Sequence, residues 1–309
     1  MRKAAFLYNP LSGGGRDRRL SDVEAAAAVL RDAGVEVCTA ATRGAAETAE
    51  QARQAIAAGC DTVFACGGDG TVHDVLQGIV GQQAALGVIP LGTANALAHD
   101  IRLPLRPVAA ARAALQATPR RIGVGRIEYR DFSGQPASRY FTVTAGVGID
   151  ALLFYRLNPL VKSRLGMTSY YAKATHLWFT HPMTRFPVSV WKDGHKREVS
   201  VSQLLAVRIR YFGGVLRELA PGASLGRNNL RLVCFHTSSR LVYLGYILRG
   251  LLGTHWNGKS IELTDAERAE CAGPTDPSHR IFVEADGELV GTLPFVITIV
   301  PDVLTLLMP

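Results

Sequence analysis

The chain has 309 residues, of which 48% are hydrophobic and 19% are charged, and this balance excludes a disordered protein. Its formal net charge of +8 favours an anionic partner, such as a nucleotide or an anionic membrane surface, although a genomic preference for arginine and alanine would account for the charge without any partner. The basic residues are spread along the chain rather than collected in one run, so we expect no nucleic-acid partner.

The length accommodates two domains of ordinary size, and no apolar run is long enough to span a membrane. The nearest run, Leu241–Leu252, is interrupted by Arg249, and we expect it to be a buried helix of a second domain. The N-terminal apolar run reaches Asn9-Pro10 too soon for a signal peptide, so it is expected to be a first strand. Five cysteines without metal-ligand spacing predict reduced thiols and a cytoplasmic protein.

Strands and helices alternate over the first 120 residues. The predicted strands are Lys3–Tyr8, Val35–Ala41, Asp61–Ala65 and Leu86–Ile89. The predicted helices are one opened by the capping box Ser21-Asp22-Val23-Glu24 and ending before Gly34, then Ala45–Ala58, Val72–Val80 and one that begins near Asn95. This alternation predicts a parallel sheet with helices on both faces, and ligands of such sheets bind at the carboxyl ends of the strands.

After about residue 120 the pattern changes to short apolar runs separated by turn signals, which predicts a mostly antiparallel β region. The predicted strands are Arg121–Tyr129, Arg139–Ala145, Val188–Trp191, Val199–Arg210, Leu230–Phe235, Ser260–Leu263, Ile281–Ala285 and Leu293–Val300. Helical stretches are expected near Ala151–Leu157, Ser169–Thr180 and Arg240–Leu252.

Two glycine-containing turns follow neighbouring predicted strands and carry the clearest chemical signal. Gly67-Gly68-Asp69-Gly70-Thr71 follows one strand, and Pro90-Leu91-Gly92-Thr93-Ala94-Asn95 follows the next. Glycine allows backbone N–H groups to approach an anion, and a helix N-terminus adds favourable potential, so these turns predict a phosphate site. Asp69 is electrostatically wrong for a bare phosphate, which implies a bridging cation or a proton-transfer role.

These residues resemble a known family of kinases. Gly67–Thr71 resembles the GGDGT signature of diacylglycerol, sphingosine, ceramide and NAD kinases, and Pro90–Asn95 is similar to the P-x-G-T-x-N of the diacylglycerol kinase catalytic family. Asn9-Pro10 with Ser12-Gly13 resembles the opening N-P-x-S-G of that family, and Asp286-Gly287-Glu288 resembles its late D-G-E. Four motifs in the right order identify the chain as a member, similar above all to the bacterial lipid kinases.

The resemblance implies a fold and an activity. It implies an N-terminal three-layer α/β nucleotide-binding domain over residues 1–120, joined by the C-terminal segment 296–309, and a mostly antiparallel β-sandwich lipid-substrate domain over residues 121–295. It implies transfer of phosphate from ATP, with Mg²⁺, to a hydroxyl of a diacylglycerol-like or sphingoid-like lipid at a membrane surface. Peripheral docking there would use the basic charge and the apolar stretch Leu241–Leu252 with Arg240 and Arg249.

The resemblance also implies roles for individual residues. The nucleotide-binding set is Asn9, Pro10, Ser12, Gly13, Thr42, Gly67, Gly68, Asp69, Gly70, Thr71, Gly92, Thr93 and Asn95. Asp69 is expected to work with magnesium, and the equivalent aspartate of sphingosine and NAD kinases is assigned to activating the acceptor hydroxyl. Thr93 is expected to bind phosphate, Asn95 to cap a helix or contact the nucleotide, and Thr42 to contact the nucleotide unless it only caps a helix.

The catalytic base is expected in the D-G-E motif. We expect Asp286 to be the base with Glu288 as its partner, and Asp69 if neither serves. Glu284, Asp286 and Glu288 would lie on one side of a strand under regular alternation, although the Asp-Gly pair is also a hairpin signal and a turn could break the pattern.

The sequence departs from the family at Ala96-Leu97, where the family often has Asp-Phe, and at two further places. His73-Asp74 stands where lipid kinases usually have Asn-Glu, and we expect His73 to be a solvated helix residue. Arg227 and Arg231 stand where bacterial diacylglycerol kinases carry acids that hold a structural magnesium, so we expect that metal site to be missing and the arginines to hold an anion or face solvent.

Three alternatives remain beside the lipid kinase. One is a soluble-acceptor kinase of the NAD-kinase type, which the lipid-kinase spacing of Asn158-Pro159, Lys162 and Tyr170-Tyr171 disfavours. Another is a non-catalytic nucleotide or lipid sensor, which would bind ATP without turnover. A dinucleotide oxidoreductase is disfavoured because no G-x-G-x-x-G follows the first strand. The acceptor lipid, and whether the chain forms a homodimer, are left open.

Overall fold

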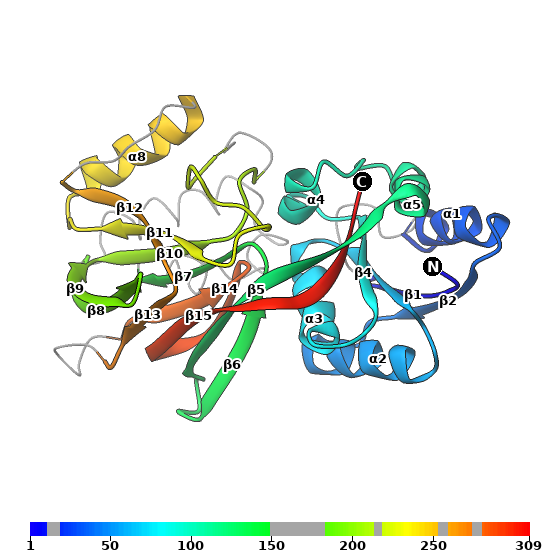
Figure 1. The fold of residues 1–309 in the computed structure, drawn as a ribbon, viewed down its shortest axis with the longest axis horizontal. Coiled ribbons are helices and arrows are strands. Elements are labelled where there is room, and N and C mark those ends of the chain that lie inside the picture. Colours follow the sequence, from blue (N-terminus) through cyan, green and yellow to red (C-terminus); the bar gives the residue numbers. More distant parts are fainter. Residues whose placement is uncertain (11–18, 149–182, 213–217, 253–258, 274–279) are drawn as a thin grey trace, which may run out of the picture.

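Figure 1 shows the chain in a computed structural model, which describes residues 1–10, 19–148, 183–212, 218–252, 259–273 and 280–309. An N-terminal α/β part and a β-rich part lie side by side, and the long strands β5 and β15 run from one to the other (Figure 1). The fold is mixed α/β with one large sheet and a C-terminal sandwich, as the sequence predicts.

The α/β part is built on parallel strands in the order β15-β4-β3-β1-β2. The first four strands of the chain are β1 (Lys3–Tyr8), β2 (Glu36–Ala41), β3 (Thr62–Gly67) and β4 (Ala85–Pro90). Every residue of β3 and β4 is buried, because helices cover both faces of the sheet.

Two helices cover each face of this sheet. The helices are α1 (Arg19–Asp32) and α5 (Pro107–Gln116) on one face and α2 (Ala45–Ala57) and α3 (Asp69–Ile79) on the other, with the short α4 (Ala96–Asp100) after β4 (Figure 1). Helices α2 and α3 pack closely, since a Cβ on Gly78 would lie 2.2 Å from the carbonyl oxygen of Ala49. The absence of a side chain at Gly78 therefore allows α3, which starts at the GGDGT turn, to lie this close to α2.

Two predicted helix starts are wrong. The described part of α1 already begins at Arg19, so Ser21 lies within the helix and does not open a capping box. Helix α3 begins at Asp69, three residues before the predicted Val72, because the extended Gly68 occupies its N-cap and the GGDGT turn itself is the first helical turn. Asp69 is thereby placed at a helix N-terminus.

The β-rich part is a sandwich. Its strands are β5 (Thr118–Arg130), β6 (Pro136–Phe141), β7 (Thr144–Gly148), β8 (Phe186–Lys192), β9 (His195–Val201), β10 (Gln203–Val207), β11 (Leu230–Phe235), β12 (Ile261–Ala266), β13 (Arg268–Cys271), β14 (Phe282–Ala285) and β15 (Glu288–Met308). One layer has the order β12-β11-β10-β7-β14, and β9-β8-β13-β15-β5-β6 forms the other. Apolar side chains from both layers, such as Phe141, Leu232 and Phe295, make a common buried core.

Two predicted strands are each divided in the structure, and β13 was not predicted. The predicted strand Arg139–Ala145 is interrupted because the N–H groups of Thr142 and Val143 donate to a side chain instead of a neighbouring strand. The predicted strand Val199–Arg210 is interrupted at Ser202, where the chain passes from β9 in one layer to β10 in the other. The helical stretches expected near 151–157 and 169–180, and the 158–171 spacing, lie outside the described residues.

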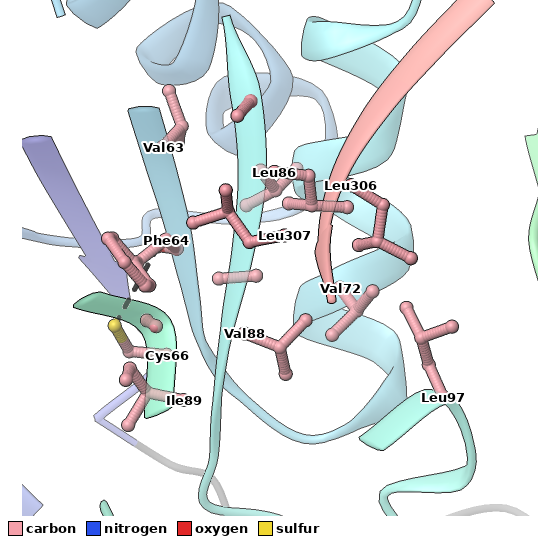
Figure 2. Packing of buried hydrophobic residues seen from close by; sticks show 14 of the residues in the cluster. Val63, Phe64, Cys66, Val72, Leu86, Val88, Ile89, Leu97, Leu306 and Leu307 are labelled. Atoms are coloured by element: carbon pink, nitrogen blue, oxygen red, sulfur yellow. Dashed lines mark hydrogen bonds between the residues drawn. The ribbon is translucent and has the colours of Figure 1, made fainter. Parts of the chain in front are cut away.

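Strand β15 contributes to both cores. It pairs with β14, β13 and β5 in the sandwich and then runs parallel to β4. Figure 2 shows its Leu306 and Leu307 in one cluster with Leu86 and Val88 of β4 and Val72 of α3.

Helix α8 (Arg240–Leu252) lies over the outer face of β11 and β12 (Figure 1). It is buried only in part, so the expectation of a buried helix is wrong for its outer face: Leu241, Leu244 and Leu248 are 80%, 46% and 50% exposed. The opposite face carries Tyr243 and Tyr246, whose rings pack on Phe235. No helix in the described part of the chain is long and apolar enough to cross a membrane.

Candidate active site

The two glycine turns contact each other at the carboxyl ends of β3 and β4. A Cβ on Gly92 would lie 2.4 Å from the Cα of Gly68, and a Cβ on Gly67 would lie 2.1 Å from Oγ1 of Thr71. The N–H of Leu91 donates to the carbonyl of Gly67 at 2.8 Å. Larger residues would force the turns apart, so these glycines bring backbone and polar side chains of both turns to one place.

Asp69 connects the starts of two helices. It is the first residue of α3, and its Oδ1 accepts the N–H of Ala96, the first residue of α4, at 2.7 Å. Burial raises the pKa of Asp69, the hydrogen bond from Ala96 opposes that change, and the nearby charge of Asp286 adds to it. The two helix N-termini favour negative charge at this point, which suits the phosphates of a nucleotide.

Asn95 closes the second turn. Its backbone is left-handed, with φ of 50°. Its side chain accepts from the N–H of Gly92 and donates to the carbonyl of the same residue, both at 2.9 Å. Asn95 occupies the N-cap position of α4, but its side chain makes no capping bond, so it shapes the loop and leaves the Thr93 hydroxyl exposed.

The first predicted nucleotide residues lie at the same edge of the sheet. The N–H of Asn9, just before Pro10, donates to the carbonyl of Cys66 at 3.2 Å, and the N–H of Thr42 donates to the carbonyl of Tyr8 at 2.8 Å. The N-cap of α2 is Gly44, so Thr42 does not cap that helix. Ser12 and Gly13 lie outside the described residues.

Asp286 is buried at the tip of the β14–β15 hairpin. Asp286 and Gly287 have φ of 49° and 82°, the left-handed pair that a two-residue hairpin needs. The Asp286 carboxylate accepts three backbone N–H groups, from Thr142 at 3.1 Å, Val143 at 2.8 Å and Thr144 at 3.0 Å. This carboxylate is therefore held by the segment between β6 and β7.

Helix α3 is bonded to the β-rich part through two side chains one turn apart. Nδ1 of His73 lies 3.4 Å from Oδ2 of Asp286, and His73 is only 3% exposed. The amide of Gln77 accepts the N–H of Tyr140 and donates to its carbonyl, both at 2.9 Å. The expectation that His73 is a solvated residue is wrong, because the second domain covers this face of α3.

Glu288 is exposed and faces the GGDGT turn. A Cβ on Gly70 would lie 2.9 Å from its Oε1. Glu284, in contrast, is fully buried, and its Oε2 accepts the N–H of Gly287 at 2.8 Å. The hairpin turn thus breaks the alternation: Glu284 is buried in β14, Asp286 is buried in the turn, and Glu288 presents a carboxylate beside the α3 N-terminus.

Asp74 and Gln77 were not assigned a role from the sequence. The pKa of Asp74 is raised to about 6, mainly by burial and also by the charge of Glu288, while His73 and Arg139 act to lower it. The spacing of Asp69, His73 and Gln77 is that of one helix face, which could have indicated that this face meets a second element.

Magnesium fits these residues only together with a nucleotide. The carboxylates of Asp69 and Glu288 are ligands that Mg²⁺ accepts, and Mg²⁺ commonly takes its other ligands from phosphates and water. No group of three or more His, Cys, Asp or Glu residues that could hold a metal occurs in the described ranges. Asp69 would hold the ion, and the phosphates would complete its shell.

Arginines occupy the loop where the family resemblance places structural acids. Arg231 donates to the carbonyl of Pro221 at 2.7 Å and pairs with Asp265 at 3.1 Å, and Arg227 lies 3.5 Å from the same carboxylate. The fully buried Arg208 donates to four carbonyl oxygens, those of Gly123, Leu225, Arg227 and Asn229. Burial lowers the pKa of Arg208 to about 10, so it stays charged at neutral pH.

Comparison with known proteins places this chain in one family of kinases. The model of the diacylglycerol kinase catalytic domain matches residues 3–127, and that of the YegS C-terminal NAD kinase beta sandwich-like domain matches residues 143–308. The chain belongs to the diacylglycerol kinase family.

Individual relatives align over nearly the whole chain. The diacylglycerol kinase of Bacillus subtilis (strain 168) is 28% identical over 95% of this chain and 92% of its own length. The diacylglycerol kinase of Mycobacterium tuberculosis (strain ATCC 25618 / H37Rv) is 30% identical over 99% of this chain and 95% of its own. A crystal structure of a diacylglycerol kinase from Bacillus anthracis str. Sterne shares the fold, with a TM-score of 0.70 and 18% identity over 100% of this chain and 97% of that one.

Proposed function

We propose that the protein transfers the terminal phosphate of ATP to a hydroxyl of a diacylglycerol-like or sphingoid-like lipid. The observation that carries this proposal is the position of the exposed Glu288 beside Gly70, the residue that follows Asp69 in the GGDGT turn. One part of the molecule supplies anion-binding turns and the other supplies a free carboxylate, which is the pairing that phosphoryl transfer to an alcohol requires.

The phosphates would lie on the turns 67–71 and 92–95. The α3 and α4 N-termini and the Thr93 hydroxyl would bind them, and Asp69 would hold magnesium. When bound, magnesium supplies charge neutralisation for the developing negative charge on the phosphoryl oxygens. Catalysis of this kind depends mainly on positioning and charge stabilisation. The contact of the two turns at Gly68 and Gly92 would therefore matter most, because it brings the phosphate-binding groups of both turns together.

Glu288 is the better placed of the two D-G-E acids to accept the proton of the hydroxyl. The Asp286 carboxylate already accepts three backbone N–H groups and is buried, whereas the Glu288 side chain is exposed. We therefore assign the base to Glu288 and a positioning role to Asp286, which fixes the hairpin against His73. This reverses the order expected from the sequence.

The acceptor lipid would be taken from a membrane surface on the cytoplasmic side, through helix α8. Its exposed Leu241, Leu244 and Leu248 recur every three or four residues, so they lie along one side of the helix. Helix α8 contains no acidic residue, and the chain has a formal net charge of +8, which together suit the apolar and anionic layers of a bilayer surface.

The test is a transfer assay with radiolabelled ATP and Mg²⁺ against a panel of diacylglycerols, sphingoid bases and NAD, with the product identified by mass. A labelled lipid in the parent, and at least a roughly thousandfold lower rate with a folded Asp69→Asn variant, would support the proposal. Labelled NAD phosphate as the main product would favour the soluble-acceptor kinase. ATP binding without any labelled product would favour a non-catalytic sensor.

A further inference from the structure

A pocket of about 560 Å³ lies between the end of α4, the start of β5 and the loop before β11. Its lining shares no residue with the glycine turns or the D-G-E hairpin. Five arginines line it, and they come from both parts of the molecule: Arg102, Arg120, Arg121, Arg210 and Arg227. The volume is in the range of sites for small molecules, roughly 300 to 1,000 Å³.

The positive charge of this pocket is compensated only in part, because the Arg227 guanidinium lies 3.5 Å from Asp265, a carboxylate that also pairs with Arg231. Asp100 is the one acidic residue of its lining, and Oδ1 of that residue already accepts the N–H groups of Arg210 and Tyr211 at 2.8 and 2.9 Å. The Arg210 guanidinium pairs with Glu218 at 3.0 Å. Arg102 and Arg120 are exposed and make no ion pair or side-chain hydrogen bond with any described residue.

The backbone of Arg102 is a second, independent observation. Arg102 follows the C-cap of α4 and has φ of 57°, in the left-handed region. Glycine is the favoured residue at this position because other side chains are strained there. An arginine therefore occupies a position where folding alone favours glycine, and its side chain lines the pocket.

The lining also has an apolar wall. Ile122, Leu225 and Met308 line the pocket together with the ring of Tyr211. Guanidinium groups bind phosphate in a planar, two-pronged geometry, and several converging ones repel each other unless an anion lies between them. The combination of guanidinium groups and apolar surface suits a phosphate carried on an organic molecule.

We propose that this arginine pocket binds the phosphate group of a phosphorylated organic anion, either a phospholipid headgroup or a soluble phosphate ester. Because Arg102 follows α4 of the α/β part and Arg210 and Arg227 belong to the β-rich part, the bound anion contacts both parts of the molecule. Because the anion binds the folded protein, its occupancy raises the free energy of unfolding with the logarithm of the ligand concentration once that concentration exceeds Kd.

The test is isothermal titration of the parent, Arg102→Gly, Arg120→Gln and the control Arg112→Gln with inorganic phosphate. Arg112 is exposed on α5, outside the pocket. A saturating non-hydrolysable ATP analogue with Mg²⁺ is present, so that the glycine turns are occupied. We expect Kd to rise roughly tenfold or more in the two pocket variants and to stay unchanged in the control. Arg102→Gly should melt no lower than the parent, because glycine relieves the backbone.

Two further arms identify the source of the phosphate. The first arm measures the affinity for monomeric short-chain phosphatidate. An affinity higher than that for inorganic phosphate would identify the ligand as a lipid headgroup, and equal affinities would identify it as a soluble anion. Equal binding of short-chain phosphatidylcholine, which carries no net charge, would overturn recognition of an anionic phosphate group. Unchanged phosphate affinity in Arg102→Gly and Arg120→Gln, or no binding by the parent, would overturn the proposal. If the ATP analogue fails to bind, that result counts against the proposed kinase and not against the pocket. The pocket is tested separately, by comparing the phosphate affinity of its variants with that of the control Arg112→Gln.

Discussion

His73 and Asp286 meet 3.4 Å apart in a fully buried contact, and they join helix α3 to the hairpin that carries Glu288. The two residues lie on different parts of the molecule, so this contact sets the distance between the GGDGT turn and the exposed Glu288 carboxylate. The geometry of the candidate active site therefore depends on Asp286, which is itself buried.

Asp286→Asn should destabilise the protein. The amide nitrogen would face a backbone N–H that the carboxylate now accepts, which leaves a buried donor without an acceptor and costs about 2 kcal/mol. Chemical denaturation monitored by circular dichroism would measure the change. A variant as stable as the parent would show that the three N–H contacts contribute little.

Glu288→Gln should leave stability unchanged and depress turnover. The exposed side chain contributes little to folding, but loss of a base should slow transfer by roughly a hundredfold to ten-thousandfold while the affinity for ATP stays near that of the parent. Steady-state rates and nucleotide titrations on the same preparation would separate the two effects. Parent-like turnover would return the search for the base to Asp69.

Folding should not depend on a structural metal. The Arg208 guanidinium supplies positive charge to four carbonyl oxygens, and Arg231 holds the neighbouring carbonyl of Pro221. Thermal melts without nucleotide should agree in chelator and in excess Mg²⁺. A melting temperature that rises steeply with Mg²⁺ would contradict this.

Arg208→Met should lower the stability of the protein by about 3 to 5 kcal/mol, because buried carbonyl groups lose their donor. The matched control is Arg112→Met on exposed α5, which should unfold like the parent.

Membrane docking should require the outer face of α8. Replacing Leu241, Leu244 and Leu248 together by serine should reduce sedimentation with anionic vesicles at least roughly tenfold without lowering the melting temperature, since these side chains are exposed. Leu115→Ser, at an exposed leucine of α5, is the control. Binding of the parent should weaken with salt, and equal binding of the triple variant would assign docking to another surface.

Asp74 should make stability depend on pH. Its pKa is about 6 in the folded protein, against an ordinary 3.8, so between about pH 4 and pH 6 only the folded state keeps the proton. Stability from this residue therefore falls as pH rises through that range. Asp74→Asn should match the parent near pH 4 and exceed it by about 1 to 2 kcal/mol at pH 8, after allowance for solvent screening.

Denaturation curves at both pH values would measure this difference, with Asp32→Asn as the exposed control. The same gain at pH 4 and pH 8 would show that burial of a charged Asp74 is not its cause.

The glycine turns could be predicted from the sequence because their requirement is local. There is no room for a Cβ at Gly67 or Gly92, and a glycine-containing turn after an apolar run can be recognised in the amino-acid sequence. The strand β11 was likewise predicted at its observed bounds, since an apolar run between turn signals specifies it. Features of this kind depend on neighbours within a few residues.

The roles of Asp286 and His73 could not be predicted, because each depends on a partner distant in sequence. Asp286 binds the segment 142–144, and that contact also divides a strand that looks continuous. His73 reads as a surface residue of α3 until a second domain covers it. In α8 both faces are apolar, so the sequence alone could not separate the buried Tyr243 from the exposed Leu241.

Strand β15 makes the folding of the α/β part depend on residues that come after the other strands of the sandwich. During synthesis, β4 is made before the β-rich part, but its partner residues on β15, Thr305 and Leu306, are made only after the other strands of that part. Until then the nascent α/β layers carry an open strand edge, of the kind that invites pairing with other chains. A fragment that stops at residue 127, where the first family match ends, would keep that edge permanently, so we expect it to aggregate instead of folding as an independent module.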